Sequence, residues 1–275
     1  DRLGLIVVDE QHRFGVQQRL SLADKGVGDE HPHQLALTAT PIPRSLAMVA
    51  YGDLDCSVID ELPPGRQPVT TTLMDHTRRD AVMRRVGSAC RAGRQAYWVC
   101  TAIEESDTLD IEAAEATLDQ LQHALLDVRI GLVHGKLKPA EKATVMAAFK
   151  AGEIQLLVAT TVIEVGVDVP NASLMIIDNA ERLGLAQLHQ LRGRIGRGAV
   201  DSHCLLLYRQ PLSDTAQERL KVMQESHDGF VIAEADLEIR GPGELLGTRQ
   251  TGLAAFRIAL LPEHEPLLVE AQDIA

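Results

Sequence analysis

The sequence is poor in aromatic residues, and several patterns that would assign it to a common protein class are absent. Aromatic side chains make up only 3% of the 275 residues, so few rings are available to stack on the bases of a single nucleic-acid strand. No apolar run reaches the roughly 18 residues of a membrane span and no signal-peptide pattern occurs, so we expect a soluble protein. The chain opens with Asp1 directly before an apolar run, and we interpret it as a fragment of a longer protein.

The sequence also contains no Cys-x-x-Cys pair. Its four cysteines, in mostly apolar surroundings, are Cys56, Cys90, Cys100 and Cys204. This pattern favours reduced thiols over disulfides or zinc ligands, and hence a cytoplasmic protein. No Gly-x-x-x-x-Gly-Lys-Ser/Thr string occurs in these residues, so the loop that cradles nucleotide phosphates is missing from them.

Positive charge is scarce overall but concentrated in one region. The formal net charge is -12 and the pI is near 5.3, which argues against a general nucleic-acid binder. From Arg182 to Arg209, however, five arginines accompany one acid, Asp201. Any contact with nucleic acid must therefore be local. Contacts along the sugar-phosphate backbone suit this composition better than stacking of aromatic side chains on bases.

Apolar runs alternate with helical periodicity, which predicts a parallel α/β sheet with helices on both faces. Strands are expected at 3–8, 96–100, 128–133, 155–159, 173–177 and 204–208. Leu118, Leu121 and Leu125 repeat at helical spacing. A further helix is expected from Pro139 to Gly152, because proline is favoured at helix starts and glycine just beyond helix ends. Two more are expected after Ser213, reaching Gly229, and over 230–237.

Asp9 and Glu10 follow the first expected strand, Leu3–Val8, whose apolar run predicts burial on both faces. Open α/β sheets place their ligands at the carboxyl ends of strands. A carboxylate there can hold hydrated magnesium, and its neighbour can polarise an attacking water. The alternative is a capped turn.

Three arginines, Arg192, Arg194 and Arg197, lie within six positions of one another and are separated by glycines. An arginine cluster of this kind suits the charge on a transferring phosphoryl group. The alternative interpretation is a solvated basic loop, because charge runs usually lie on the surface.

Polar pairs also follow two later strands, His134-Gly135 after one and Thr160-Thr161 after another. Backbone N–H groups and hydroxyls at such positions could bind phosphate oxygens. For a lone histidine after a strand, a surface loop is the favoured alternative.

Several strings resemble the motifs of superfamily 2 helicases, in the order and spacing of that family. The matches are Asp9-Glu10-Gln11-His12 to motif II, Thr38-Ala39-Thr40-Pro41-Ile42-Pro43-Arg44 to motif III, Ala159-Thr160-Thr161 through Asp168 to motif V, and Gln190-x-x-Gly193-Arg194-x-Gly196-Arg197 to motif VI. The resemblance implies ATP and Mg²⁺ as cofactors, with the magnesium held through water by Asp9.

The resemblance also implies a role for each matching residue. Catalysis would involve Asp9, Glu10, Gln190, Arg194 and Arg197. Nucleotide binding would involve Asp9, Asp168, Arg194 and Arg197. Coupling of the nucleotide site to nucleic acid would involve His12, Thr38 and Thr40, and contacts with DNA would involve His134, Gly135, Thr160 and Thr161.

A glycine-rich segment from Asp236 to Gly252 has the composition of a structured loop. It resembles the TRG motif shared by RecG and the transcription-repair coupling factor Mfd, and the string from Arg240 to Gly252, followed by Phe256-Arg257, favours RecG. By that resemblance, Arg240 and Gln250 belong to a helical hairpin and loop that transmit domain movement to duplex DNA. A flexible linker is the alternative, although linkers rarely interleave Ile, Leu and Arg in this way.

We therefore expect three segments: 1–62, the end of a first RecA-like domain; 63–210, a second RecA-like domain; and 211–275, the TRG element. A turn-rich stretch, Ile59–Arg66, marks the first boundary. ATP hydrolysis is expected between the two RecA-like domains.

The function implied is that of a RecG-type ATP-dependent DNA helicase that remodels stalled forks and Holliday junctions in recombination and repair. A monomer is expected, with DNA and a single-strand-binding protein as partners. The alternatives are an Mfd motor, an RNA helicase, and a non-catalytic nucleic-acid-binding protein. Without the phosphate-cradling loop, the fragment alone is expected to hydrolyse essentially no ATP.

Overall fold

The computed structural model describes residues 3–9, 32–38, 55, 57–59, 61, 67–101, 107–161, 169–198 and 200–240. They belong to two compact units, one formed by Asp1–Cys56 with Arg240–Ala275 and the other by Ser57–Ile239. By this division, residues 211–239 belong to the larger unit. The domain boundaries expected after residues 62 and 210 stay predictions.

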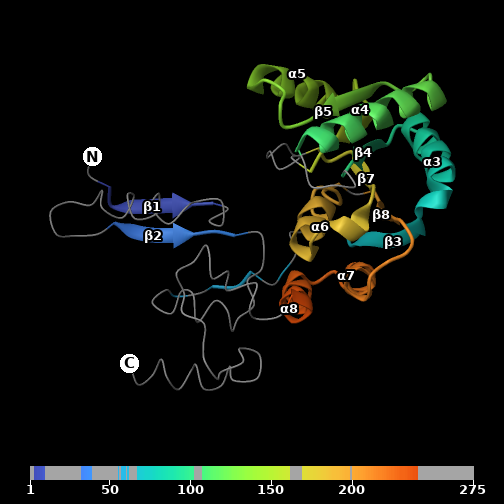
Figure 1. The fold of residues 1–275 in the computed structure, drawn as a ribbon. Helices are drawn as coiled ribbons and strands as arrows, with labels where there is room; N and C mark the ends of the chain where they lie inside the picture. The colour runs from blue at the N-terminus through green and yellow to red at the C-terminus, as the bar shows by residue number, and fades with distance from the viewer. Residues whose placement is uncertain are drawn as a thin grey trace. The chain divides into compact units, whose positions relative to one another are not determined.

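In the smaller unit, β1 (Leu5–Val8) and β2 (His33–Ala36) form a parallel pair (Figure 1). The strand expected at 3–8 is confirmed, but its burial on both faces is wrong. Ile6 is only 7% exposed, whereas Leu5 and Val7 are 59% and 55% exposed. Successive side chains of a strand point to opposite faces, and only one face of β1 is covered.

The larger unit contains a six-stranded parallel sheet in the order β3-β8-β7-β4-β6-β5. Its strands are β3 (Val69–Asp75), β4 (Gln95–Val99), β5 (Ile130–Val133), β6 (Leu156–Ala159), β7 (Ala172–Ile177) and β8 (Ser202–Tyr208). The five strands expected in this region are confirmed, with β5 beginning at Ile130 instead of Val128. β3 was not expected from the sequence.

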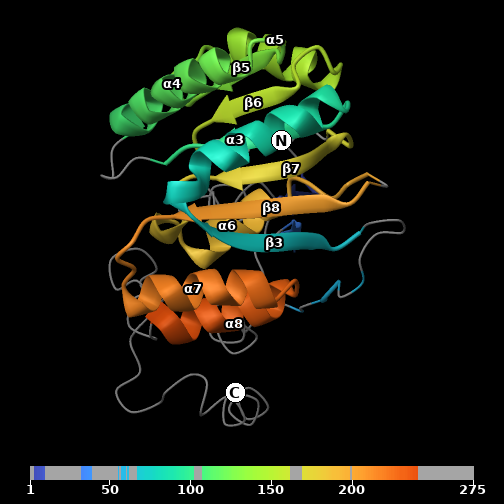
Figure 2. The same cartoon turned by 90° about the vertical axis from the view of Figure 1, so that its right-hand side faces the viewer.

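Helices cover both faces of this sheet (Figure 2). They are α3 (Arg79–Arg91), α4 (Asp107–Ala124), α5 (Pro139–Lys150), α6 (Leu185–Arg192), α7 (Asp214–Glu225) and α8 (Gly229–Arg240), with short 3₁₀ turns η2 (His76–Arg78) and η3 (Ala180–Arg182). Apolar side chains of α3 and α4 bury one face, and those of α5 to α8 bury the other. The expected doubly wound α/β architecture is confirmed.

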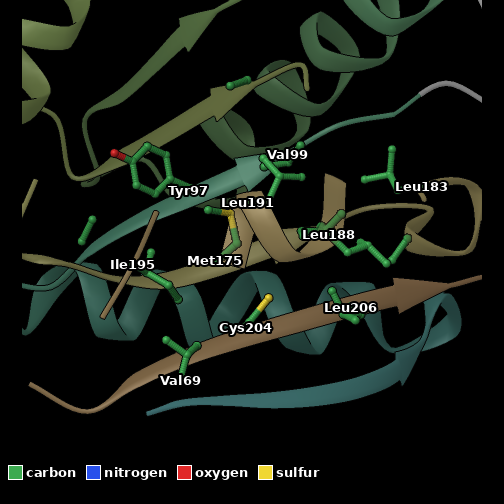
Figure 3. Packing of buried hydrophobic residues seen from close by; sticks show 14 of the residues in the cluster. Val69, Tyr97, Val99, Met175, Leu183, Leu188, Leu191, Ile195, Cys204 and Leu206 are labelled. Carbon is green, nitrogen blue, oxygen red and sulfur yellow. The ribbon is translucent and has the colours of Figure 1, made fainter. Parts of the chain in front are cut away.

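The central strand β4 shows why both faces are apolar. Tyr97 and Val99 enter one core, while Ala96 and Trp98 enter the other. All four are at most 2% exposed. Figure 3 shows the first core, where Met175 of β7 and Cys204 of β8 lie among these side chains. Burial on both faces is typical of parallel sheets and holds the strand ends in fixed positions.

The ends of two helices follow from local sequence. The Oγ of Ser213 accepts a hydrogen bond from the backbone N–H of Ala216 at 3.2 Å, which confirms the expected cap of α7. α8 continues to Arg240, so the first residues of the glycine-rich segment are helical, contrary to the expected loop. Ile232 and Leu237 are buried along this helix, and the glycines of the segment begin only at Gly241.

Three cysteines, Cys90, Cys100 and Cys204, are free, buried thiols, as expected. Burial raises the pKa of Cys90 to about 11 and that of Cys100 and of Cys204 to about 12, so all three stay protonated at neutral pH. Cys56 lies outside the described residues. None of the helices in the described segments has the length and apolar composition that a membrane span requires.

Candidate nucleotide and nucleic-acid sites

The carboxyl ends of all six strands meet at one edge of the larger sheet. His134 follows β5 and Thr160 follows β6, and these strands are neighbours with Val133 opposite Ala159. The backbone N–H of Thr160 donates to the carbonyl of Val133 at 3.3 Å. The structure therefore brings together the two polar pairs that the sequence separates by 26 positions, His134-Gly135 and Thr160-Thr161.

This corner of the edge contains unsatisfied polar atoms. Within the described part of the chain, the Nδ1 of His134 and the Oγ1 of Thr160 are buried without a hydrogen-bond partner. Gly135 is exposed, and Thr161 is half-buried. Buried polar atoms without partners are unfavourable, so a ligand that bonded to them would be favoured.

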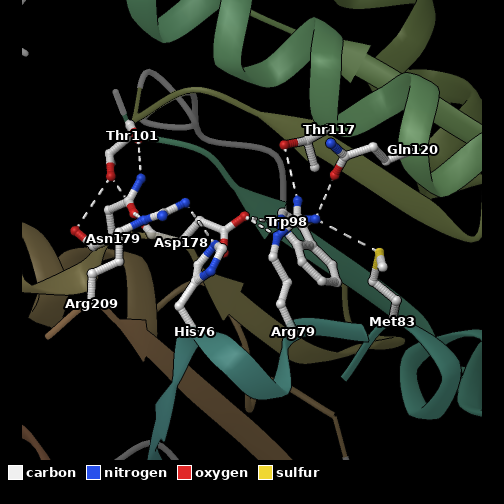
Figure 4. A network of polar contacts seen from close by, with 10 residues as sticks. All are labelled: His76, Arg79, Met83, Trp98, Thr101, Thr117, Gln120, Asp178, Asn179 and Arg209. Atoms are coloured by element: carbon white, nitrogen blue, oxygen red, sulfur yellow. Dashed lines mark hydrogen bonds and ion pairs between the residues drawn. The ribbon is translucent and has the colours of Figure 1, made fainter. Parts of the chain in front are cut away.

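A polar network lies farther along the same edge, around Asp178 at the end of β7 (Figure 4). The Nε1–H of Trp98 donates to Oδ2 of Asp178 at 2.8 Å, and the Nε of Arg79 lies 3.2 Å from the same oxygen. The Arg79 guanidinium also stacks over the Trp98 ring, 5.1 Å from its centroid. Arg79 is held further by Thr117 and Gln120, at 3.1 and 2.6 Å.

Asn179, the next residue, joins three strand ends. Its Nδ2 donates to the carbonyl of Thr101 beyond β4 at 2.7 Å, and its Oδ1 accepts from the Nε of Arg209 beyond β8 at 2.9 Å. Its backbone is left-handed, with φ of 50°, and asparagine tolerates this better than most residues. A strained backbone position held by surrounding bonds is a feature of functional sites.

These residues surround a cavity of about 590 Å³. The side chains that line it include His76, Arg79, Thr101, Asp178, Asn179 and Arg209. None of these residues was expected from the sequence. The rule that located His134 and Thr160, a polar residue directly after a parallel strand, would also have found Thr101 and Asp178.

The arginine-glycine loop lies at the opposite, amino edge of the sheet. A Cβ at Gly196 would lie 2.8 Å from Cγ2 of Val69, the first residue of β3, and a Cβ at Gly198 would collide with the carbonyl of Pro170, just before β7. Gly196 has φ of +78°, and the neighbouring Ile195 is fully buried. The loop is thus fixed to the sheet through its apolar residue and its glycines.

The candidate residues of motif VI differ in exposure. Gln190 and Arg194 are half-buried, and Arg197 is exposed. Both arginines lie in the loop that Ile195 and the two glycines fix to the amino edge of the sheet.

The third arginine of the expected cluster, Arg192, has a different role. It is 4% exposed, and its Nη1 donates to the carbonyls of Met223 and Ser226 at 2.9 and 2.8 Å and to Oγ1 of Thr71 at 3.3 Å. Burial lowers the pKa of its guanidinium. Its inclusion in the ligand-binding cluster is wrong, because it is buried and joins the end of α6 to the end of α7.

In the smaller unit, Asp9 and Thr38 lie at the same end of the β1–β2 pair. The backbone N–H of Leu37 donates to the carbonyl of Val8 at 2.7 Å, and both Asp9 and Thr38 are exposed. Arg240 is the last residue of α8. The remaining expected residues lie outside the described parts of the chain: Glu10, His12, Thr40, Asp168 and Gln250.

The doubly wound parallel sheet gives the larger unit the fold of a RecA-like helicase domain. Residues 78–199 match the family model of the helicase conserved C-terminal domain, and residues 226–275 match that of ATP-dependent DNA helicase RecG, domain 3, C-terminal. The chain is homologous to RecG helicases over its whole length.

Individual relatives support this assignment. ATP-dependent DNA helicase RecG of Escherichia coli (strain K12) is 67% identical over 99% of the chain, and that of Pasteurella multocida (strain Pm70) is 61% identical over 99%. The chain spans 40% of the length of each of these proteins.

Solved structures agree with the fold. The structure of RecG bound to a three-way DNA junction is 42% identical, with a TM-score of 0.72 over 97% of this chain and 33% of that chain. S. cerevisiae Dbp5 L327V bound to RNA and ADP BeF3 has a TM-score of 0.58 at 15% identity, over 86% of this chain and 62% of that one. The second likeness shows the fold alone.

Proposed function

We propose that the chain is the motor segment of an ATP-dependent DNA helicase that remodels branched DNA, such as stalled forks and Holliday junctions, in recombination and repair. The observation that carries this proposal is the 67% identity to a RecG helicase across 99% of the chain. The solved RecG bound to a three-way junction supports branched DNA as the substrate.

For the nucleotide, we propose separate contributions from the two units. Asp9 at the end of β1 would hold Mg²⁺ through water, and its exposed carboxylate suits a hard cation of this kind. Glu10 would polarise the attacking water. Arg194 and Arg197 would stabilise charge on the phosphoryl group, with Gln190 beside them, and Asp168 would contact the ribose. The bound ion would supply neutralisation of phosphate charge.

For the nucleic acid, we propose that His134, Gly135, Thr160 and Thr161 contact the backbone. Two of these residues have buried, unsatisfied polar atoms in the described structure. His12, Thr38 and Thr40 would couple nucleotide state to this track. Arg240 and Gln250 would belong to the TRG element acting on duplex DNA. The proposed setting is a cytoplasmic monomer acting with a single-strand-binding protein.

A chimera tests the proposal directly: the matching 40% of E. coli RecG is replaced by this chain, and ATP hydrolysis is measured with forked DNA, linear duplex and single-stranded RNA. We expect forked DNA to stimulate most, and Arg197→Ala to lower the rate roughly a thousandfold or more, as for a lost arginine finger. Arg85→Gln, an exposed change on α3, is the matched control.

Three outcomes would contradict the proposal. Best stimulation by RNA would reject branched DNA as the substrate, and an unchanged rate in Arg197→Ala would reject its catalytic role. The 275 residues alone are expected to bind ATP weakly and to hydrolyse essentially none. Measurable magnesium-dependent ATP hydrolysis by the isolated chain would therefore also contradict the proposed roles.

A further inference from the structure

The cavity at the carboxyl edge lies between β4 and β7, where the chain connections run in opposite directions across the sheet. From β4 the chain continues to β5 on one side, and from β7 it continues to β8 on the other. In open α/β sheets, such a switch point is where ligands bind. The proposed contacts of His134 and Thr160, which follow β5 and β6, do not include this part of the edge.

The two arginines of the cavity differ in what they can offer a ligand. Arg79 is 11% exposed in its side chain, ion-paired with Asp178, and bonded through both terminal nitrogens. Arg209 is exposed and forms no ion pair with any residue that the structure describes. Its charge is therefore available at the cavity.

Two polar neighbours orient the guanidinium of Arg209, and its charge also acts on the half-buried carboxyl of Glu181, whose pKa it lowers although burial raises that pKa overall. Nε donates to Asn179, which is 8% exposed, and Nη2 lies 3.0 Å from Nε2 of His76. Because arginine only donates, His76 accepts here, and its ring is neutral with the proton on Nδ1. Burial and the Arg209 charge lower the pKa of His76, in agreement with this neutral form.

The other charges of the cavity allow an anion. Asp178 is already neutralised by Arg79. Glu112 also lines the cavity, but it is exposed, so its repulsion of an anion is weakened by solvent. A guanidinium held in one plane, with terminal N–H groups available, suits a phosphate group.

We propose that this cavity is a second DNA contact of the sheet, in which Arg209 binds a backbone phosphate of the nucleic acid that reaches the edge at His134 and Thr160. The inference rests on the proposed function. Four strand spacings of about 4.8 Å separate β5 from β8 in the sheet, so the two contacts are roughly 19 Å apart. That length corresponds to about five or six base steps of 3.4 Å.

The salt dependence of DNA binding tests the contact. The 275-residue chain is titrated with a forked duplex at several salt concentrations between about 50 and 200 mM, and the slope of log Kobs against log[salt] is determined. Arg209→Gln is expected to reduce the magnitude of the slope by about 0.9, the value for one phosphate contact. Arg85→Gln, which removes an equal charge from the outer surface of α3, is expected to leave it unchanged.

Arg209→Lys separates direct binding from a structural role. Lysine keeps the charge but loses the planar geometry that holds Asn179, so the slope is expected to stay near that of the wild type. Glu112→Gln, which removes the exposed acid of the cavity, is expected to tighten binding slightly. If Lys and Gln at position 209 reduced the slope equally, or if Arg209→Gln matched Arg85→Gln, the proposal would be overturned.

Inorganic phosphate is the second probe, because a free phosphate compound has the same chemistry as the DNA backbone. One outcome is that inorganic phosphate raises the Tm of the wild type and of Arg209→Lys but not that of Arg209→Gln, while the DNA slope stays the same in all three. In that case the cavity binds a free phosphate compound, and the DNA contact is rejected. If the wild-type chain has no measurable affinity for DNA, the proposed function is rejected as well. If the chain binds DNA but Arg209→Gln leaves the salt slope unchanged, only this inference is rejected.

Discussion

Each edge of the larger sheet has an arginine that is largely or fully buried, Arg79 at one and Arg192 at the other, and the two have different partners. Arg79 at the carboxyl edge pairs with the carboxylate of Asp178. Arg192, toward the amino edge, binds two carbonyls at the end of α7, and no carboxylate pairs with it in the parts of the chain that the structure describes. The contrast shows that a buried arginine can be held either by a carboxylate or by backbone carbonyls, so its sequence neighbours alone do not reveal its role.

The largest effect is expected for Arg79→Met. The substitution leaves Asp178, which is 5% exposed, buried without its cation. Breaking a buried ion pair in this way costs about 3–5 kcal/mol of unfolding free energy. Urea unfolding measures the loss, and adding Asp178→Asn should recover part of it. A loss below about 1 kcal/mol would show that the pair does not stabilise this edge.

A smaller effect is expected for Arg192→Met. It removes the hydrogen bonds to Met223 and Ser226 but leaves no unpaired buried charge. The unfolding free energy should fall by about 1–3 kcal/mol, the cost of unsatisfied buried carbonyls. The same urea titration provides the comparison, and a loss larger than that of Arg79→Met would reverse the contrast between the two edges.

Gly196→Ala tests how tightly the amino-edge loop is fixed. Left-handed backbone costs a non-glycine residue about 1–2 kcal/mol, and the new Cβ would lie 2.8 Å from Val69. Gly93→Ala is the matched control, because Gly93 has φ of +88° but nothing within 4 Å of a Cβ. Thermal unfolding should show a larger loss at position 196; equal losses would mean that the Val69 contact relaxes without cost.

The smallest effect concerns His76. Its pKa is lowered in the folded chain, mainly by burial and then by Arg209, so the unfolded chain binds more protons as pH falls below the ordinary value of 6.5. The stabilising contribution is therefore present above pH 6.5 and is lost as pH falls toward the lowered pKa. His76→Gln should flatten this part of the stability profile. An unchanged profile would remove His76 from the account.

Part of the fold and of the site is readable from the sequence, and particular residues show the limit. His134 and Thr160 could be placed together because the carboxyl ends of parallel strands share one edge. β3 was missed because its run Val69–Asp75 is rich in threonine and lacks the apolar pattern of the other strands. The pair of Arg79 and Asp178 joins positions 99 apart, and no local pattern encodes such a contact.

Arg192 shows a second limit. Spacing alone groups it with Arg194 and Arg197, whereas the end of α6 turns its side chain into the core. The position at which a helix ends determines which charged side chains of a cluster reach solvent. Helix ends can be predicted from sequence only approximately.

Amide hydrogen exchange of the chain, with and without forked DNA, tests most directly whether the two edges have different roles. We expect slower exchange in the loops at 134–138 and 160–161 when DNA is added without nucleotide, and unchanged exchange at residues 193–198. Equal protection of 193–198 by DNA alone would contradict the separation of a nucleic-acid edge from a nucleotide edge.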